Sequence, residues 1–385
     1  MVRLFISTGE VSGDLQGALL VEALQRQSQA LGLQLEIVAL GGDRMAAAGA
    51  TLVGHTTGLS SIGLIEALPY VVPTLQLQRR ARQYLQQHPP DLVVLIDYIA
   101  ANVPLGNFIR QNFSIPVVYY IAPQEWVWHH SDRMTRKIVA LSDRLLAIFP
   151  EEATYYRAHG ANVTWVGHPL LERIQTAPTR QQARQSLGLD PTDLAVALFP
   201  ASRQQEIHFL LPPIFEAAQQ IQTQLNTVKF FIPLSRDKYR QSLIEAIQTY
   251  GLRAHLVNDP LQVLAAADLA IAKSGTVNLE AALLNVPQVV IYRVNPLSLW
   301  LFRRFVDFSP DYVSPVNLVQ RQPIVPELLQ EQATGTNIAQ QALELLLNPA
   351  RRQTMLQQYE QMRLSLGTPG AVERAAQEIL QLLSP

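Results

Sequence analysis

The chain contains no cysteine, which excludes disulfide bonds, a thiolate nucleophile and zinc–sulfur or iron–sulfur sites. Charged residues are also scarce, at 16%, against roughly 25% in an average globular protein. The 30 basic and 31 acidic residues leave a formal net charge of −1, so no global field draws the chain to nucleic acid or an anionic membrane. Since 48% of its 385 residues are apolar, we expect a folded chain with a sizeable core.

Long apolar runs are missing as well. No segment approaches the ~18 consecutive apolar residues that a membrane helix requires. The N-terminal apolar run ends at Gly9 and Glu10, too early for the apolar region and small-residue cleavage site of a signal peptide. We therefore expect a cytoplasmic protein that is soluble or peripheral to a membrane.

Short apolar segments alternate with helical ones, which predicts parallel sheets with crossover helices. The expected strands of the first half are residues 2–7, 35–40, 92–97, 117–121, 144–149 and 163–166. The alternation starts again at Leu194, and the expected strands of the second half are residues 194–200, 228–233, 253–257, 268–272 and 287–293. The last 50 residues have a helical pattern throughout.

This organisation predicts two doubly wound α/β domains, spanning residues 1–172 and 194–335. Residues 173–193 are polar and contain two prolines, and we interpret them as a linker with a short helix. Residues 336–385 are expected to form helices that pack on the first domain or are exchanged in a dimer. Two such domains facing each other form a cleft, and ligands bind at the carboxyl ends of the strands.

The first of these strand ends is followed by residues 8–14, Thr-Gly-Glu-Val-Ser-Gly-Asp. Its two glycines allow a tight turn and a close approach of backbone. A structural interpretation is equally open, because Ser12 and Asp14 are good helix caps. The loop matches neither the Walker A nor the Gly-x-Gly-x-x-Gly pattern.

Another rim loop, residues 122–130, carries two Trp and two His. Aromatic rings offer flat apolar faces and imidazole can exchange a proton, although the Trp pair can equally cap the sheet edge. Adjacent histidines rarely reach one ion, so no metal site is expected here. His168 stands between Gly and Pro at a later strand end, where a structural and a functional role are equally open.

In the second domain, Arg203 directly precedes a helix, where a guanidinium and free helix amides both favour an anion. The alternative is an ion pair with Glu206. Residues 272–282 contain a strand end, a Ser-Gly-Thr turn and a helix start, which can hold a pyrophosphate. Glu280, one turn into that helix, can accept both hydroxyls of a ribose, whereas the structural alternative makes Ser274 or Thr276 a helix cap.

These segments together resemble the lipid-A-disaccharide synthase family, which are glycosyltransferases with two facing Rossmann-like domains (GT-B type). The resemblance covers essentially the whole chain. It is carried by residues 9–14, 96–97, 123–128, 166–169, 202–206, 274–280, 292–293, 317 and 326–330.

The resemblance implies transfer of 2,3-diacylglucosamine from UDP to 2,3-diacylglucosamine 1-phosphate (lipid X), with inversion and without a metal or cofactor. It also implies peripheral association with the inner membrane and a homodimer formed through the C-terminal segments. The residues implied to bind the UDP-sugar are Arg203, Glu206, Ser274, Gly275, Thr276, Glu280 and Asn317. Those implied on the sugar and acceptor side are Ser12, Gly13, Asn102, Gln124, Trp126 and His168.

One motif departs from the family pattern Ile-Asp-x-Pro-Asp-Phe-Asn. The second Asp, the family's candidate general base, is Ala100 in this chain, and a positioned base contributes typically about 10²–10⁴-fold. The remaining candidates for catalysis are Asp97, Glu10, Asp14 and His129. The alternatives are a relative with another acceptor and a non-catalytic binder of UDP-sugar or lipid.

Two further segments, residues 62–72 and 296–305, combine apolar bulk with a few charges. Such segments are typical of interfacial helices and also of ordinary core helices. A lipid substrate favours the interfacial interpretation, through the resemblance rather than through the pattern.

Overall fold

The computed structural model describes residues 1–57, 64–127, 132–200, 204–295 and 312–383. The chain divides into two compact units. The first combines Met1–Pro169 with Leu366–Pro385, and the second lies between Leu170 and Ser365. Each unit is built on a parallel sheet with crossover helices, which confirms the fold class expected from the sequence.

The first unit contains a seven-stranded sheet in the order β3-β2-β1-β4-β5-β6-β7. The strands are β1 Val2–Ser7, β2 Leu35–Gly41, β3 Thr51–His55, β4 Leu92–Ile96, β5 Val117–Tyr120, β6 Arg144–Ala147 and β7 Val163–Trp165. The central strands are apolar throughout because both of their faces are buried. The edge strand β3 was not predicted, since its residues are only partly buried and its sequence has no apolar run.

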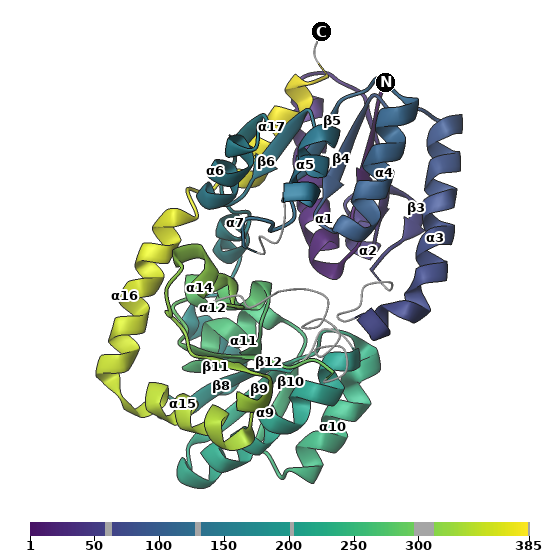
Figure 1. The fold of residues 1–385 in the computed structure, drawn as a ribbon. Coiled ribbons are helices and arrows are strands. Elements are labelled where there is room, and N and C mark those ends of the chain that lie inside the picture. Colours follow the sequence, from purple (N-terminus) through teal and green to yellow (C-terminus); the bar gives the residue numbers. More distant parts are fainter. Residues whose placement is uncertain (58–63, 128–131, 201–203, 296–311, 384–385) are drawn as a thin grey trace. The chain divides into compact units, whose positions relative to one another are not determined.

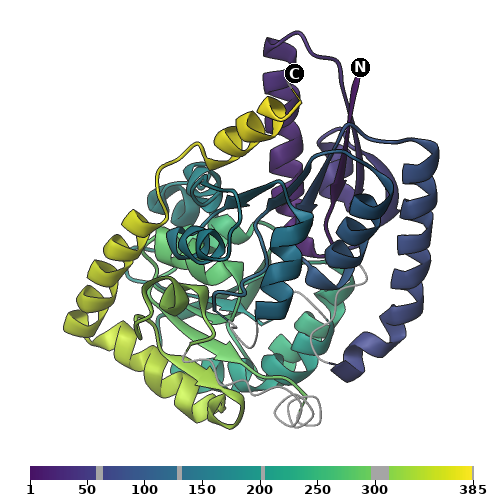
Figure 2. The same cartoon turned by 45° about the horizontal axis from the view of Figure 1, so that its top comes forward.

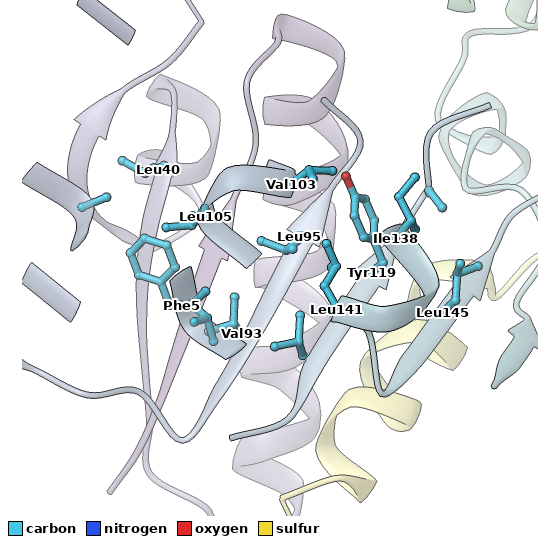
Figure 3. Packing of buried hydrophobic residues seen from close by; sticks show 14 of the residues in the cluster. Phe5, Leu40, Val93, Leu95, Val103, Leu105, Tyr119, Ile138, Leu141 and Leu145 are labelled. Carbon is cyan, nitrogen blue, oxygen red and sulfur yellow. The ribbon is translucent and has the colours of Figure 1, made fainter. Parts of the chain in front are cut away.

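Helices cover both faces of this sheet (Figure 1). They are α1 Val11–Ala30, α2 Asp43–Ala47, α3 Leu64–Gln87, α4 Ile99–Asn112, α5 Asp132–Leu141, α6 Pro150–Ala158 and α17 Ala371–Gln381. On one face, Val103 of α4 and Leu141 of α5 pack against Leu95 and Tyr119 of the strands (Figure 3). The other face is covered by α1, against which α17 packs.

The second unit contains a six-stranded sheet in the order β10-β9-β8-β11-β12-β13. The strands are β8 Leu194–Phe199, β9 Val228–Pro233, β10 Ala254–Val257, β11 Leu269–Lys273, β12 Gln288–Tyr292 and β13 Glu327–Leu329. The helices are α7 Leu170–Gln175, α8 Arg180–Ser186, α9 Gln204–Gln224, α10 Arg240–Thr249, α11 Pro260–Ala266, α12 Thr276–Leu283, α14 Pro315–Gln320, α15 Gly335–Leu347 and α16 Pro349–Ser365. Two short 3₁₀ turns, η1 Asp237–Tyr239 and η2 Gln330–Gln332, complete it. The edge strand β13 is too short to show a sequence pattern.

Residues 173–193, expected to form a linker with a short helix, contain that helix as α8. Residues 173–175 end α7, and both helices lie within the second unit. Arg180 and Arg184 of α8 bind the two carboxylate oxygens of Asp268, at 2.6 and 3.3 Å. The polar composition therefore reflects ion pairs that hold α8 to the domain rather than a solvated connection.

The C-terminal helix α17 belongs to the first unit and lies beside α1 (Figure 2). Glu373 of α17 accepts from Arg26 and Gln27 of α1, both at 2.6 Å. Arg374 donates to the carbonyl of Val166 at 2.8 Å. Within this chain α17 packs on the first unit, while α15 and α16 belong to the second. Exchange of the segment in a dimer stays a prediction.

We expect Ile379→Ala to lower the free energy of unfolding by about 2–5 kcal/mol, the range for an aliphatic side chain removed from a core. Ile379 is fully buried on the face of α17 that packs on the unit. Urea denaturation followed by circular dichroism measures the change. Gln377→Ala, at an exposed position of the same helix, is the control, and equal stability of the two variants would contradict this account of α17.

Candidate functional site

Each sheet has one point where neighbouring strands lead to helices on opposite faces, and open α/β sheets bind ligands there, beyond the carboxyl ends of the strands. In the first unit this point lies between β1 and β4, and in the second between β8 and β11. The loops after these four strands, together with the helices that follow them, contain most of the residues that the sequence singled out.

Asp97 and Tyr98 follow β4 with left-handed backbone angles, φ of 49° and 44°. For residues other than glycine this conformation costs about 1–3 kcal/mol each, so it persists only where surrounding contacts impose it. One contact is the ring of Tyr98 against Gly9, where a Cβ would lie 1.8 Å from the ring. Gly9 therefore lets the loop after β1 approach the loop after β4 closely.

Asn102, in the first turn of α4, fixes the same loops and is fully buried. Its Nδ2 donates to the carbonyls of Ile96 and Asp97 at 2.9 and 2.8 Å. The Ser7 hydroxyl at the end of β1 donates to Asn102 Oδ1 at 2.7 Å. The amide thus joins the ends of β1 and β4 and holds the backbone of Asp97.

The Asp97 side chain lies in an environment that opposes its charge. Burial, with a smaller contribution from nearby Glu10, raises the pKa of Asp97 to about 7. A carboxyl group with such a pKa is ionised in part of the molecules at neutral pH and can accept a proton. Of the four candidates for catalysis, Asp97 and Glu10 are thus brought together.

The other residues of the first loop have structural contacts. Glu10 is the N-cap of α1 and Ser12 lies in its first turn, while Gly13 leaves room for the Thr8 side chain. Asp14 does not cap α1, because its carboxylate accepts from the backbone amides of Gly42 at 2.7 Å and Met45 at 3.2 Å. It therefore caps α2.

The loop after β5 contains buried side chains. The indole of Trp126 is buried and donates to Gln124 Oε1 at 2.6 Å, which favours the structural interpretation of this residue. His168 is buried 5.0 Å from the Phe149 ring, and burial lowers its pKa to about 3. Its imidazole is consequently neutral at physiological pH.

Glu152 of α6 received no role from the sequence, although it is fully buried beneath this loop. Its carboxylate accepts from the amides of Ala122 at 3.1 Å and Ile148 at 2.9 Å. Burial raises its pKa to about 8, although these hydrogen bonds oppose the shift. The Tyr156 hydroxyl, one turn further on, donates to the Pro123 carbonyl at 2.7 Å. A sequence signal existed, since Glu at the third helical position commonly bonds the backbone before the helix.

In the second unit, the Ser-Gly-Thr turn joins β11 to α12. Gly275 has φ of 154° and ψ of −169°, a conformation that is essentially confined to glycine. Its amide donates to Asn278 Oδ1 at 2.8 Å, and the Ser274 hydroxyl donates to the Val313 carbonyl at 2.9 Å. Thr276 begins α12, so neither Ser274 nor Thr276 is the cap, which is Gly275.

The remaining residues that the resemblance implied for UDP-sugar binding, Glu206, Glu280 and Asn317, are buried and paired. Glu280 accepts from Arg173 at 2.6 Å, and Glu206 accepts from Lys273 at 3.0 Å. Asn317 donates to the Val325 carbonyl at 2.9 Å and to Glu327 at 2.8 Å. Burial raises the pKa of that glutamate.

Two of the sequence-based candidates, His129 and Arg203, lie outside the described residues. Within the ranges that the structure describes, no three His, Asp or Glu side chains gather as a metal site would require.

Comparison with known proteins completes this description. The family model for lipid-A-disaccharide synthetase matches residues 4–381. The chain belongs to this family. A lipid-A-disaccharide synthase from Gloeothece citriformis is 55% identical over 98% of this chain and 99% of its own. A lipid-A-disaccharide synthase from Synechocystis is 52% identical over 99% of this chain and 98% of its own.

A solved structure agrees on the fold. The UDP-GlcNAc 2-epimerase from Neisseria meningitidis, bound to UDP-GlcNAc, covers 99% of both chains with a TM-score of 0.65 at 12% identity. At this identity the likeness shows the fold alone. It agrees with two Rossmann-like domains, and the family resemblance identified from the sequence motifs is confirmed.

Asp97 belongs to the motif in which this chain departs from the lipid-A-disaccharide synthase family pattern. The hydrogen bonds of Asn102 hold the backbone of that motif in place. We expect Asn102→Ala to lower the free energy of unfolding by about 1–3 kcal/mol, because buried carbonyls lose their donor. Asn102→Asp should cost more, since a carboxylate would face those same carbonyls. Urea denaturation of both variants measures the difference, and a milder effect of the aspartate would contradict the assigned contacts.

Proposed function

We propose that this chain transfers a 2,3-diacylglucosamine unit from UDP to 2,3-diacylglucosamine 1-phosphate, giving the tetraacyl disaccharide 1-phosphate and UDP. The family membership supports glycosyl transfer from a UDP-sugar in lipid A synthesis. The observation that carries the mechanism is Asp97, a carboxyl group with a pKa near 7 at the first unit's switch point.

Asp97 is the general base in this proposal. Its carboxylate accepts the proton of the acceptor's 6-hydroxyl while that oxygen attacks C1 of the donor sugar. The C1–O bond to UDP breaks on the opposite side, so the configuration at C1 inverts. Burial, with a smaller contribution from Glu10, raises the pKa of Asp97 to about 7, which is in the range where a base works at neutral pH.

The donor is assigned to residues 194–335 and the acceptor to residues 1–172. At the β11–α12 turn, the first residues of α12, Thr276 and Val277, have amides without an intrahelical acceptor, and these can hold phosphate oxygens. Glu280 lies one turn further into α12, where it is proposed to accept the ribose hydroxyls. Its Arg173 partner would orient this carboxylate.

Ala100 was the reason to consider another acceptor or a non-catalytic binder. Ala100 is exposed in the first turn of α4, and Asp97 lies in the same motif, three residues earlier. Close relatives that match the whole chain carry the synthase name. These observations do not favour the alternatives, and a base at Asp97 removes the need for one at Ala100.

The acylated substrates also require access to a membrane surface, and we assign this contact to α3. Its residues Leu68, Val71, Val72 and Leu75 are 66%, 46%, 61% and 63% exposed and share one helix face. Arg79 and Arg80 follow and are exposed. An apolar face beside cations suits the surface of an anionic bilayer, on the cytoplasmic side of the inner membrane. No helix in the described part of the chain is long and apolar enough to span a membrane.

The direct test incubates the purified chain with UDP-2,3-diacylglucosamine and 2,3-diacylglucosamine 1-phosphate and follows products by mass spectrometry. Tetraacyl disaccharide 1-phosphate and UDP in equal amounts are expected. A reaction without the acceptor is the control for donor hydrolysis. UDP binding without disaccharide formation would overturn the assigned acceptor.

We expect Asp97→Asn to lower kcat by about 10²–10⁴-fold. In the unaltered chain, kcat/KM should rise with pH through about 7, because the base must be ionised. The acidic groups that interact with Asp97 are Glu10 and Glu152. Glu10→Gln removes one negative charge and should lower the pKa of Asp97, so the rise of kcat/KM should shift to lower pH.

Glu22→Gln is the matched control, since Glu22 is an exposed glutamate of the same helix α1. It should leave the pH profile unchanged. Full activity of the Asp97→Asn variant would contradict the assignment of the base. So would a rise of kcat/KM at the same pH in Glu10→Gln and in the unaltered chain.

The double variant Val72→Ser and Leu75→Ser tests the membrane contact by co-sedimentation with vesicles containing phosphatidylglycerol. Burying one such side chain contributes about 1.5–3 kcal/mol, so the partition coefficient onto the vesicles should fall by at least about tenfold. Leu347→Ser with Leu364→Ser changes two exposed leucines on α15 and α16 and should leave binding intact. Unchanged binding of the α3 variant would exclude this face.

A further inference from the structure

Lys273 is the last residue of β11 and stands beside the switch point of the second unit. Its ammonium lies 3.0 Å from Glu206 Oε1, and the two side chains are only 16% and 8% exposed. Glu206 belongs to the first turn of α9, the helix that follows β8. The ion pair therefore spans the gap between β8 and β11, where sheets of this kind bind ligands.

The backbone of the neighbouring turn has few donors left for an anion. The Ser274 amide donates to the Ile291 carbonyl at 3.0 Å, and its hydroxyl donates to the Val313 carbonyl. The Gly275 amide donates to Asn278. The amides of Thr276 and Val277 remain for phosphate oxygens, but they are neutral. The negative charge of a diphosphate at this turn is therefore best met by a cationic side chain.

Lys273 is placed to supply that charge. A Cβ built on Gly275 would lie 3.6 Å from Lys273 Nζ, so the ammonium faces the side of the turn where glycine leaves space. A lysine has three N–H donors. Within the described ranges Nζ has Glu206 as its one hydrogen-bond partner, which leaves two donors for phosphate oxygens.

We propose that Lys273 binds the diphosphate of the donor and stabilises the departing UDP. This rests on the proposed binding of UDP at the β11–α12 turn. When the C1–O bond breaks, its electron pair moves to the β-phosphate oxygen, while C1 bonds to the acceptor oxygen and the acceptor proton goes to Asp97. Lys273 offsets the negative charge that develops on the phosphate, and Glu206 orients the ammonium toward the turn.

The test compares the binding of uridine, UMP and UDP by isothermal titration calorimetry. Lys273→Met removes the charge and keeps the length of the side chain. A lost hydrogen bond to a charged group weakens binding roughly 10–100-fold. We expect that loss for UDP, with uridine affinity unchanged. Lys273→Arg keeps a charge and should bind UDP within about tenfold of the unaltered chain.

Lys229→Met is the matched control. Lys229 forms a similar ion pair, with Asp193 at 2.7 Å. It stands near the start of β9, at the amino ends of the strands and away from the carboxyl ends where the ligand is proposed to bind. Its removal should leave the affinities for all three ligands unchanged. If Lys273→Met fails to fold by circular dichroism, Lys273→Gln takes its place.

Two outcomes overturn the proposal, and they differ. Full UDP affinity in folded Lys273→Met or Lys273→Gln, with UDP bound by the unaltered chain, would reduce Lys273 to a bridge between β11 and α9 and leave the proposed function standing. Absence of UDP binding by the unaltered chain would instead remove the donor site, and with it both the proposed function and the role of Lys273.

Discussion

The carboxyl edge of each sheet depends on one buried amide side chain. Asn102 in the first unit and Asn278 in the second both lie in the first turn of the helix that follows the switch-point strand. Asn102 bonds the backbone at the ends of β1 and β4. Asn278 bonds the amide of Gly275 and the side chain of Gln288. Because an unpaired buried backbone group is costly, these hydrogen bonds fix the positions of the loops after β4 and β11.

The two amides have different consequences for chemistry. In the first unit, Asn102 supports the strained backbone at Asp97 and holds its carboxyl group where burial raises the pKa. In the second unit, Asn278 itself consumes a donor of the Ser-Gly-Thr turn. In the proposed site, recognition of an anion is therefore shared between the amides of Thr276 and Val277 and a side chain, and Lys273 is the nearest described cation to Gly275. The same type of residue thus holds the proposed base in one unit and shapes the turn proposed to bind an anion in the other.

The strands with continuous apolar runs could be predicted because both of their faces are buried. The edge strands β3 and β13 could not be predicted, and neither could the ion pairs that attach the short helix α8 to its domain. β3 is partly exposed, β13 has three residues, and the arginines of α8 pair with Asp268, which lies more than 80 residues away. In the site, the motif positions were visible, but Asp14 proved to bind the amides before α2, and Glu152 was not assigned a role although it holds the loop after β5.

The sequence alone therefore determined the two α/β units and the family, and it singled out the loops that are proposed to carry function. Periodicity, turn residues and motif order are local properties that one chain displays directly. Only the tertiary structure decided which polar side chains are engaged and which face a ligand position, as in the pairing of Lys273 with Glu206 across 67 residues. Burial and hydrogen bonding depend on neighbours that are distant in sequence, and these set the pKa of Asp97 and the charge at the second unit's turn.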